Sequence, residues 1–212
     1  AEPVLRWERS DRVVPGLHEI REVAGHRQFA KQLLTSSFIT PRPAMSTQTK
    51  ERPGLSWKEV CEDPNLQDLP YKIETNDRGQ IVMSPTCAWH GRFAYQVAQL
   101  LEEHLPEGGS SVETAIRTAR GTKVADAIWC TAERWAEIKD AYDVPVAPEI
   151  CVEVRSPTNT DDERAEKRQL YLETGAEEVW ICDEDGQLTF YDAEGEQEAS
   201  QRVPAFPSRI DA

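Results

Sequence analysis

Several features that define large classes of proteins are missing from this sequence. No apolar stretch approaches the length that crosses a bilayer, and the first residues do not show a signal-peptide pattern. The five cysteines are odd in number, widely spaced and without a CxxC pair, which argues against both a disulfide framework and a zinc site. There is also no glycine-rich phosphate loop, no GxSxG and no HExxH. We therefore expect a cytoplasmic protein with reduced thiols and no membrane segment.

Basic residues are the minority charge, and they are unevenly distributed. The chain has 24 Lys and Arg against 38 Asp and Glu, a net charge of −14. Residues 1–50 carry eight basic and five acidic side chains, so residues 51–212 carry the remaining 16 and 33, a balance of −17. This shift predicts an N-terminal extension over 1–50, with a natural translation start expected at Met45, and one domain over 51–212. An acidic domain can bind nucleic acid only through a locally basic surface.

The segment from Pro148 to Trp180 predicts a compact crossover unit. Residues 150–154 alternate apolar and other side chains with a period of two, as in a strand. Thr160 and Glu163 form a capping-box signature for a helix that Gly175 would end. Residues 178–182 read as a second strand. A strand, a helix and a strand within this length predict two parallel strands joined by a crossover helix.

The rest of the chain predicts a mixed sheet with flanking helices. In order we expect a short helix within 55–66, a hairpin of 71–74 and 80–83, a helix over 88–104, strands over 111–117 and 122–129, a helix over 132–141, and a hairpin of 178–182 with 188–191 before a polar tail. The fold class is accordingly α/β, or α+β in its segregated form.

Charged side chains fall at unusual places in the crossover unit. Glu153 and Arg155 share one face of the first strand, where the chain leaves the sheet. On the helix, Lys167 shares a stripe with Leu170 and Tyr171, which should face the sheet. Lys167 could therefore be carried inward toward Glu153. It could equally form an exposed ion pair with Glu163, four residues earlier.

Two further polar residues occur in apolar surroundings. Asp126 lies inside the most apolar strand of the preceding chain, where an unpaired carboxylate would be costly. It must therefore be hydrogen-bonded or hold a cation. His90 lies on or beside the buried stripe of the helix over 88–104, where a histidine is more often a packing residue than a catalytic one.

These residues could together support phosphodiester chemistry. Mg²⁺ prefers oxygen ligands, which Asp126 and Glu153 could supply from adjacent strands, with the backbone carbonyl of Val154 as a third. Such a metal lowers the pKa of bound water, and a nearby Lys or Arg could stabilise the charge on the phosphoryl group. The spacing alone is not specific, since Asp and Glu-x-basic patterns are common in acidic proteins.

The order of the sequence blocks resembles one family over about residues 55–192. The blocks are Ile81–Pro85 with His90, then Val124–Asp126, then 152–159, then Lys167, Tyr171 and Gly175, and finally Glu178–Trp180. They resemble the Uma family, largely bacterial restriction endonucleases of the PD-(D/E)XK superfamily, in which residues 1–50 have no counterpart. The resemblance implies a restriction-endonuclease-like core, a magnesium-dependent endonuclease that cuts DNA, and metal ligands at Asp126 and Glu153. Mn²⁺ is the expected substitute for Mg²⁺.

Two departures from the family pattern affect its interpretation. Ala125 stands where a proline is expected before Asp126, and Arg155 stands where Glu-x-Lys would have its lysine. Arginine can stabilise a phosphate through its charge but cannot act as a base. Lys167 and Arg155 therefore compete for the role of the basic residue, Arg155 only as a source of positive charge. The alternative to an active enzyme is a catalytically inactive nuclease-fold protein that binds nucleic acid or protein. A homodimer is expected by analogy, because cutting both DNA strands needs two sites.

Overall fold

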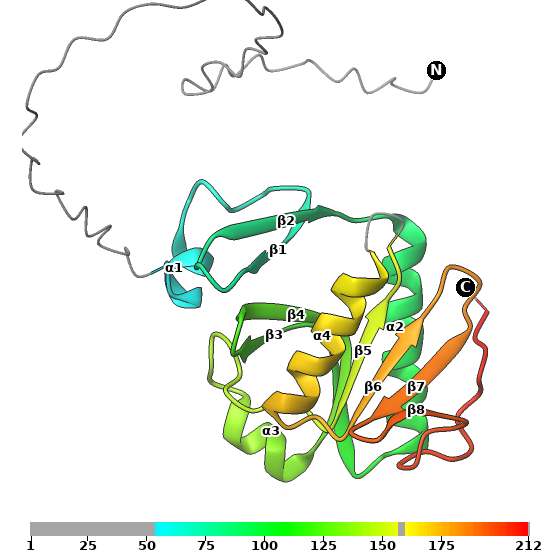
Figure 1. Ribbon diagram of the computed structural model, residues 1–212. Helices are drawn as coiled ribbons and strands as arrows, with labels where there is room; N and C mark the ends of the chain where they lie inside the picture. Colours follow the sequence, from blue (N-terminus) through cyan, green and yellow to red (C-terminus); the bar gives the residue numbers. More distant parts are fainter. Residues whose placement is uncertain (1–53, 157–159, 212) are drawn as a thin grey trace, which may run out of the picture. The chain divides into compact units, whose positions relative to one another are not determined.

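A computed structural model describes residues 54–156 and 160–211 of the protein (Figure 1). The predicted extension over 1–50, its start at Met45 and residues 157–159 of the family pattern lie outside the described residues.

The fold is built on a six-stranded mixed sheet. Its strands lie in chain order, β3 (Gly108–Thr118), β4 (Gly121–Thr131), β5 (Ile150–Val154), β6 (Glu178–Cys182), β7 (Leu188–Asp192) and β8 (Gly195–Gln197). All neighbouring pairs are antiparallel except β5 and β6, which run parallel and are joined by the crossover helix α4 (Asp161–Thr174). The predicted crossover unit and the mixed α/β fold are therefore confirmed.

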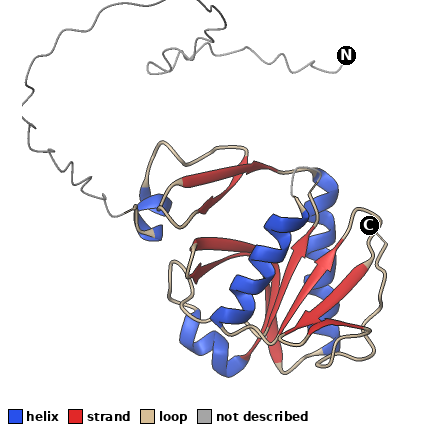
Figure 2. Ribbon diagram, in the orientation of Figure 1, coloured by secondary structure: helices blue, strands red, loops and turns tan. Residues whose placement is uncertain are grey.

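Helices cover both faces of this sheet (Figure 2). On one face, α2 (Ala88–His104) packs its apolar stripe of Phe93, Val97 and Leu101 against the core. On the other face lie α4, which contributes the fully buried Tyr171, and the short α3 (Ala132–Ile138). The predicted bounds of α2 are confirmed, whereas α3 ends three residues before the predicted Ala141.

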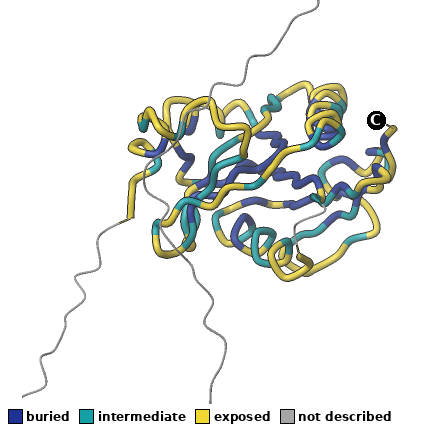
Figure 3. Tube along the Cα trace, turned by 90° about the horizontal axis from the view of Figure 1, so that it is seen from above, coloured by how far each residue is buried: buried dark blue, intermediate teal, exposed yellow. Residues whose placement is uncertain are grey.

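The central strands are buried on both faces (Figure 3). Every residue of β5 is buried, and in β4 burial runs from Thr122 to Cys130. A strand enclosed by helices on both sides must be apolar at nearly every position, because neither face meets water. The buried polar residues of these two strands are Thr122 and Lys123 near the start of β4 and, further along, the carboxylates of Asp126 and Glu153.

The first hairpin forms a separate two-stranded sheet. It consists of β1 (Tyr71–Thr75) and β2 (Ile81–Pro85), and it follows the short helix α1 (Trp57–Glu62), whose capping box is complete. The hairpin joins β4 through side chains rather than a backbone ladder. The backbone N–H of Thr122 donates to the Thr75 hydroxyl at 2.8 Å, and that of Val124 donates to the Glu74 carboxylate at 2.8 Å.

The C-terminal segment differs from the prediction of a polar tail. It adds β8 to the sheet and then buries Val203, Phe206 and Ile210 in the main core. The ring of Phe206 lies 4.6 Å from that of Trp180 between centroids. These three residues are three and four positions apart, as on a helix face, but Pro204 and Pro207 between them argue against a helix, so the sequence pattern did not reveal their burial. Among the described residues, no helix has the length and apolar character that crossing a membrane requires.

Candidate active site

Asp126 lies at the point where the ladder between β4 and β5 ends. The last backbone pair of this ladder is Ala127 with Val152, so Asp126 and Glu153 come next on the two strands. One carboxylate oxygen of Asp126, Oδ2, accepts a hydrogen bond of 2.7 Å from the backbone N–H of Val154. The side chain of Asp126 therefore takes over from the backbone in holding the two strands together. The group of Val154 that contacts Asp126 is its backbone N–H, whereas the sequence analysis considered its backbone carbonyl.

Two cationic or potentially cationic groups also contact Asp126. The ammonium of Lys72, from β1, bonds to Oδ1, and Nε2 of His90, from α2, lies 3.3 Å from Oδ2. Burial would raise the pKa of Asp126, but the charge of Lys72 and the hydrogen bond from His90 outweigh it and hold this pKa far below its usual value. Burial lowers the pKa of His90, and the hydrogen bond and charge of Asp126 reverse that effect and raise it. Of the two alternatives considered for Asp126, a hydrogen bond and a cation, the structure shows both.

Glu153 is held by two donors from α4. Nζ of Lys167 lies 2.8 Å from Oε2, and the hydroxyl of Tyr171 donates to Oε1 at 2.7 Å. These donors are four residues apart and therefore share one face of the helix. Of the two orientations considered for Lys167, the structure shows the inward one, while Glu163 completes the cap at Thr160.

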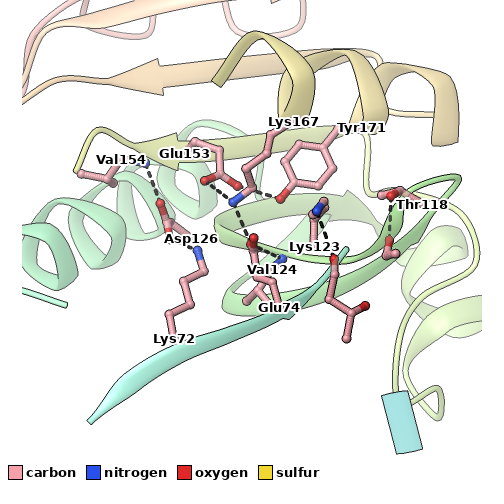
Figure 4. A network of polar contacts seen from close by, with 12 residues as sticks. Lys72, Glu74, Thr118, Lys123, Val124, Asp126, Glu153, Val154, Lys167 and Tyr171 are labelled. Carbon is pink, nitrogen blue, oxygen red and sulfur yellow. Dashed lines mark hydrogen bonds and ion pairs between the residues drawn. The ribbon is translucent and has the colours of Figure 1, made fainter. Parts of the chain in front are cut away.

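A third carboxylate, Glu74 of β1, completes the network (Figure 4). Its Oε1 lies 2.8 Å from Nζ of Lys167, so this lysine bridges Glu74 and Glu153. Burial would lower the pKa of Lys167, but the charges of Glu153 and Glu74 outweigh it and raise this pKa strongly. The lysine is consequently an ammonium ion at neutral pH, a hydrogen-bond donor and not a base. Burial is the main cause that raises the pKa of Glu153. The charge of Lys167 lowers this pKa, and the charges of Asp126 and Glu74 raise it.

These charged side chains line one small cavity of about 30 Å³, which we call the carboxylate cavity. Its lining includes Asp126, Glu153, Val154, Lys167 and His90, all of which the sequence had singled out. Arg155 does not line this cavity. Its side chain is 45% exposed and faces Glu184, 3.8 Å away in the turn between β6 and β7.

Sequence reasoning missed two charged lining residues and the role of a third residue nearby. Lys72 and Glu74 alternate on one face of β1, a period-two signal that was present in the predicted hairpin. Nothing in the sequence, however, says that this face meets β4, which lies some fifty residues further along. Tyr171 was expected to face the sheet, but its hydrogen bond to Glu153 depends on how α4 crosses β5.

The donor set at the cavity is chemically suited to a hard divalent cation. Asp126 and Glu153 present carboxylate oxygens beside each other, and a cation, the Lys72 ammonium, bonds to the former. In residues 54–156 and 160–211, no three Asp, Glu, His or Cys side chains come close enough together to form a complete metal site. A metal held by this pair would therefore take its remaining ligands from backbone or water.

Comparisons with known proteins agree with the fold and the family resemblance. The chain is similar to a crystal structure described as a putative nuclease belonging to DUF820 from Anabaena variabilis ATCC 29413, with a TM-score of 0.56 and 15% identity over 68% of this chain and 83% of that one. No curated protein matches the sequence significantly. The model of the Uma2 family, described as "Putative restriction endonuclease", matches residues 63–211. With most of its length matched, including every residue that lines the carboxylate cavity, the chain belongs to the Uma2 family of restriction-endonuclease-like proteins.

Proposed function

We propose that this protein is a magnesium-dependent endonuclease that hydrolyses phosphodiester bonds in DNA. The observation that carries the proposal is the convergence of Asp126 and Glu153, two buried carboxylates from adjacent strands, on one cavity that Lys167 also lines. Buried carboxylates destabilise a fold unless their charges are used or compensated, and such groups gather at functional sites. Membership in a family described as restriction endonucleases supports the same reading.

In this proposal the metal ligands are the carboxylates of Asp126 and Glu153 and the backbone carbonyl of Val154. When bound, Mg²⁺, or Mn²⁺ in its place, lowers the pKa of a coordinated water and offsets charge that develops on the phosphoryl group. Charge balance at the cavity also favours a cation. Three carboxylates, of Glu74, Asp126 and Glu153, face two ammonium groups, of Lys72 and Lys167, which leaves one negative charge when His90 is neutral. A phosphate would be repelled from this cavity until a further cation arrived.

The protein's own residues orient the reacting groups. Lys167 takes the basic role in this proposal, because its ammonium lies 2.8 Å from Glu153 and can donate a hydrogen bond to a phosphate oxygen. Its raised pKa makes it an electrostatic stabiliser of the phosphoryl group and not the proton acceptor. His90 and Tyr171 act through Asp126 and Glu153 as positioning residues. Arg155, which pairs with Glu184, has no part in the step.

Hydrolysis forms a bond from the water oxygen to phosphorus and breaks one phosphorus–oxygen ester bond of the backbone. The water loses a proton, and the leaving oxygen gains one. We propose a homodimer for the active species, since two equivalent sites could cut the two strands of a duplex.

The direct test compares three purified proteins on supercoiled plasmid DNA with Mg²⁺ and with EDTA. The unchanged protein should nick and linearise the plasmid only with Mg²⁺, and Asp126→Asn should remove this activity. Asp185→Asn, which changes an exposed carboxylate in the turn between β6 and β7, should cleave like the unchanged protein. Equal residual cleavage by all three proteins would indicate a contaminating nuclease. Binding of plasmid without cleavage by any of them would favour the alternative, an inactive nuclease fold that serves as a binding module.

A further inference from the structure

A larger cavity, of about 530 Å³, lies beside the carboxylate cavity. Residues of α1, β1, β3 and α3, with the segment after α3, line it, and we call it the aromatic groove. Four aromatic side chains contribute to its walls, namely Trp57, Tyr71, Trp135 and Tyr142. Its volume falls within the range of roughly 300–1,000 Å³ that is usual for small-ligand sites.

Three of the four aromatic side chains of this groove are exposed to an unusual degree. Tyr71 is 46% exposed, Trp135 46% and Tyr142 51%, and Val112 between them is 43% exposed. These residues come from four separate segments, yet they line one concavity. Large apolar side chains that gather on one exposed surface mark a binding site more often than singly scattered ones do.

The aromatic groove and the carboxylate cavity share one lining residue, Lys72. This residue lines both cavities, and its ammonium bonds to Asp126. Tyr71 and Ile73, its neighbours in β1, line only the groove. A nucleotide in the groove would therefore lie across Lys72 from Asp126 and Glu153.

The charges of the groove oppose a polyanionic ligand less than those of the protein as a whole do. Its charged lining residues are Lys139 and Glu113, which balance, and Lys72, whose ammonium is already paired with Asp126, in a chain of net charge −14. For comparison, the cavity lined by Glu177, Glu178, Asp192, Glu194 and Arg202 carries four acidic residues and one basic residue. A phosphate backbone would be repelled more strongly there than at the groove.

We propose that the aromatic groove binds an unpaired nucleobase of the nucleic-acid substrate, next to the phosphodiester bond at Asp126 and Glu153. The proposal rests on the nuclease function proposed above and narrows its substrate class to DNA with an unpaired or single-stranded nucleotide. Every base has a flat face that stacks on aromatic side chains, whereas a base inside a duplex is already stacked and paired. An aromatic surface beside a phosphodiester site thus selects nucleotides that have left the duplex.

The test measures binding separately from cleavage. The Asp126→Asn protein is titrated in EDTA, by fluorescence anisotropy, with two labelled duplexes of equal length, one fully paired and one with a single unpaired thymine. We expect the duplex with the unpaired base to bind about tenfold more tightly, the effect of one stacked base. Adding Trp135→Ala or Tyr71→Ala should remove most of this preference, and Trp135→Phe should keep it.

Tyr95→Ala is the matched control, because Tyr95 on α2 is 52% exposed and does not line the groove. Its preference should equal that of the parent protein. Equal binding of both duplexes, no DNA binding at all, or a preference that survives both alanine variants would each overturn the proposal. Cleavage of the same two duplexes by the unchanged protein with Mg²⁺ tests the nuclease function itself. A preference for the unpaired base without cleavage would support the groove and refute the catalytic assignment.

Discussion

The ammonium of Lys167 is expected to be the most important single charge for the stability of this fold. Its side chain is 14% exposed and lies 2.8 Å from each of two carboxylates, Glu74 and Glu153, whose side chains are 15% and 10% exposed. Lys167→Met keeps the length and most of the volume of the side chain but leaves both carboxylates without this cation. Breaking a buried ion pair by removing one partner costs about 3–5 kcal/mol. We therefore expect Lys167→Met to lower the free energy of unfolding at pH 7 by that amount.

The control is the same substitution at an exposed site. Lys58 on α1 is 59% exposed and lies 3.7 Å from Glu62 across one helical turn, so Lys58→Met should cost less than about 1 kcal/mol. Urea denaturation followed by tryptophan fluorescence gives both values. The reasoning is refuted if the two variants lose similar stability, because burial would then not govern the value of the charge.

The pH dependence of Lys167→Met gives a second, independent check. Without the ammonium, the pKa values of Glu74 and Glu153 in the folded state should lie above those in the unfolded chain. Carboxyl groups of this kind favour folding below the unfolded pKa, about 4.3, and this advantage is lost as the pH rises through the folded pKa. The stability deficit of the variant should hence shrink as the pH falls from 7 toward 5. A deficit that is constant over this range would show that the two carboxylates remain compensated by other groups.

Three further substitutions test other contacts of the structure. Tyr171→Phe removes one hydrogen bond to Glu153 from a fully buried ring, so urea denaturation should show a loss of about 1–2 kcal/mol, and an unchanged midpoint would contradict that bond. Phe206→Ala should lower the free energy of unfolding, measured by thermal denaturation, by about 3–5 kcal/mol, since Phe206 is 6% exposed and packs in the core. A loss as small as that of an exposed residue would mean that the C-terminal segment does not pack against the core. Asp143→Asn should cost about 1–2 kcal/mol at pH 7. Burial opposes ionisation of Asp143, but hydrogen bonds from Arg117 and Thr122 outweigh it and lower the pKa of Asp143. The difference from the unchanged protein is therefore fully present above about pH 4 and should decline as the pH falls further. A difference as large at about pH 3 as at pH 7 would argue against this ion pair.

The sequence alone determined the order and type of most elements and the identity of the central carboxylates. Strong periodicity and local capping signals fixed α2 and α4, because a helix stripe and a capping box are formed by residues close together in the chain. Asp126 and Glu153 were recognisable because charged residues stand out in strands that are apolar at nearly all other positions. The pairing of β4 with β5 then follows from the family resemblance and brings them side by side.

Only the tertiary structure decided what surrounds these carboxylates. Lys72 and Glu74 reach the site because the β1–β2 hairpin lies against β4, a contact between side chains far apart in sequence that leaves no local pattern. The choice between Lys167 and Arg155 as the residue at the cavity was likewise open, since a lysine on a helix and an arginine on a strand fit the same spacing rules. The rotation of α4 over β5 turns Lys167 toward Glu153, whereas Arg155, just after β5, faces Glu184 and lies outside the cavity. Periodicity describes one element at a time, and the relative placement of two elements is set by packing, which the sequence encodes only collectively.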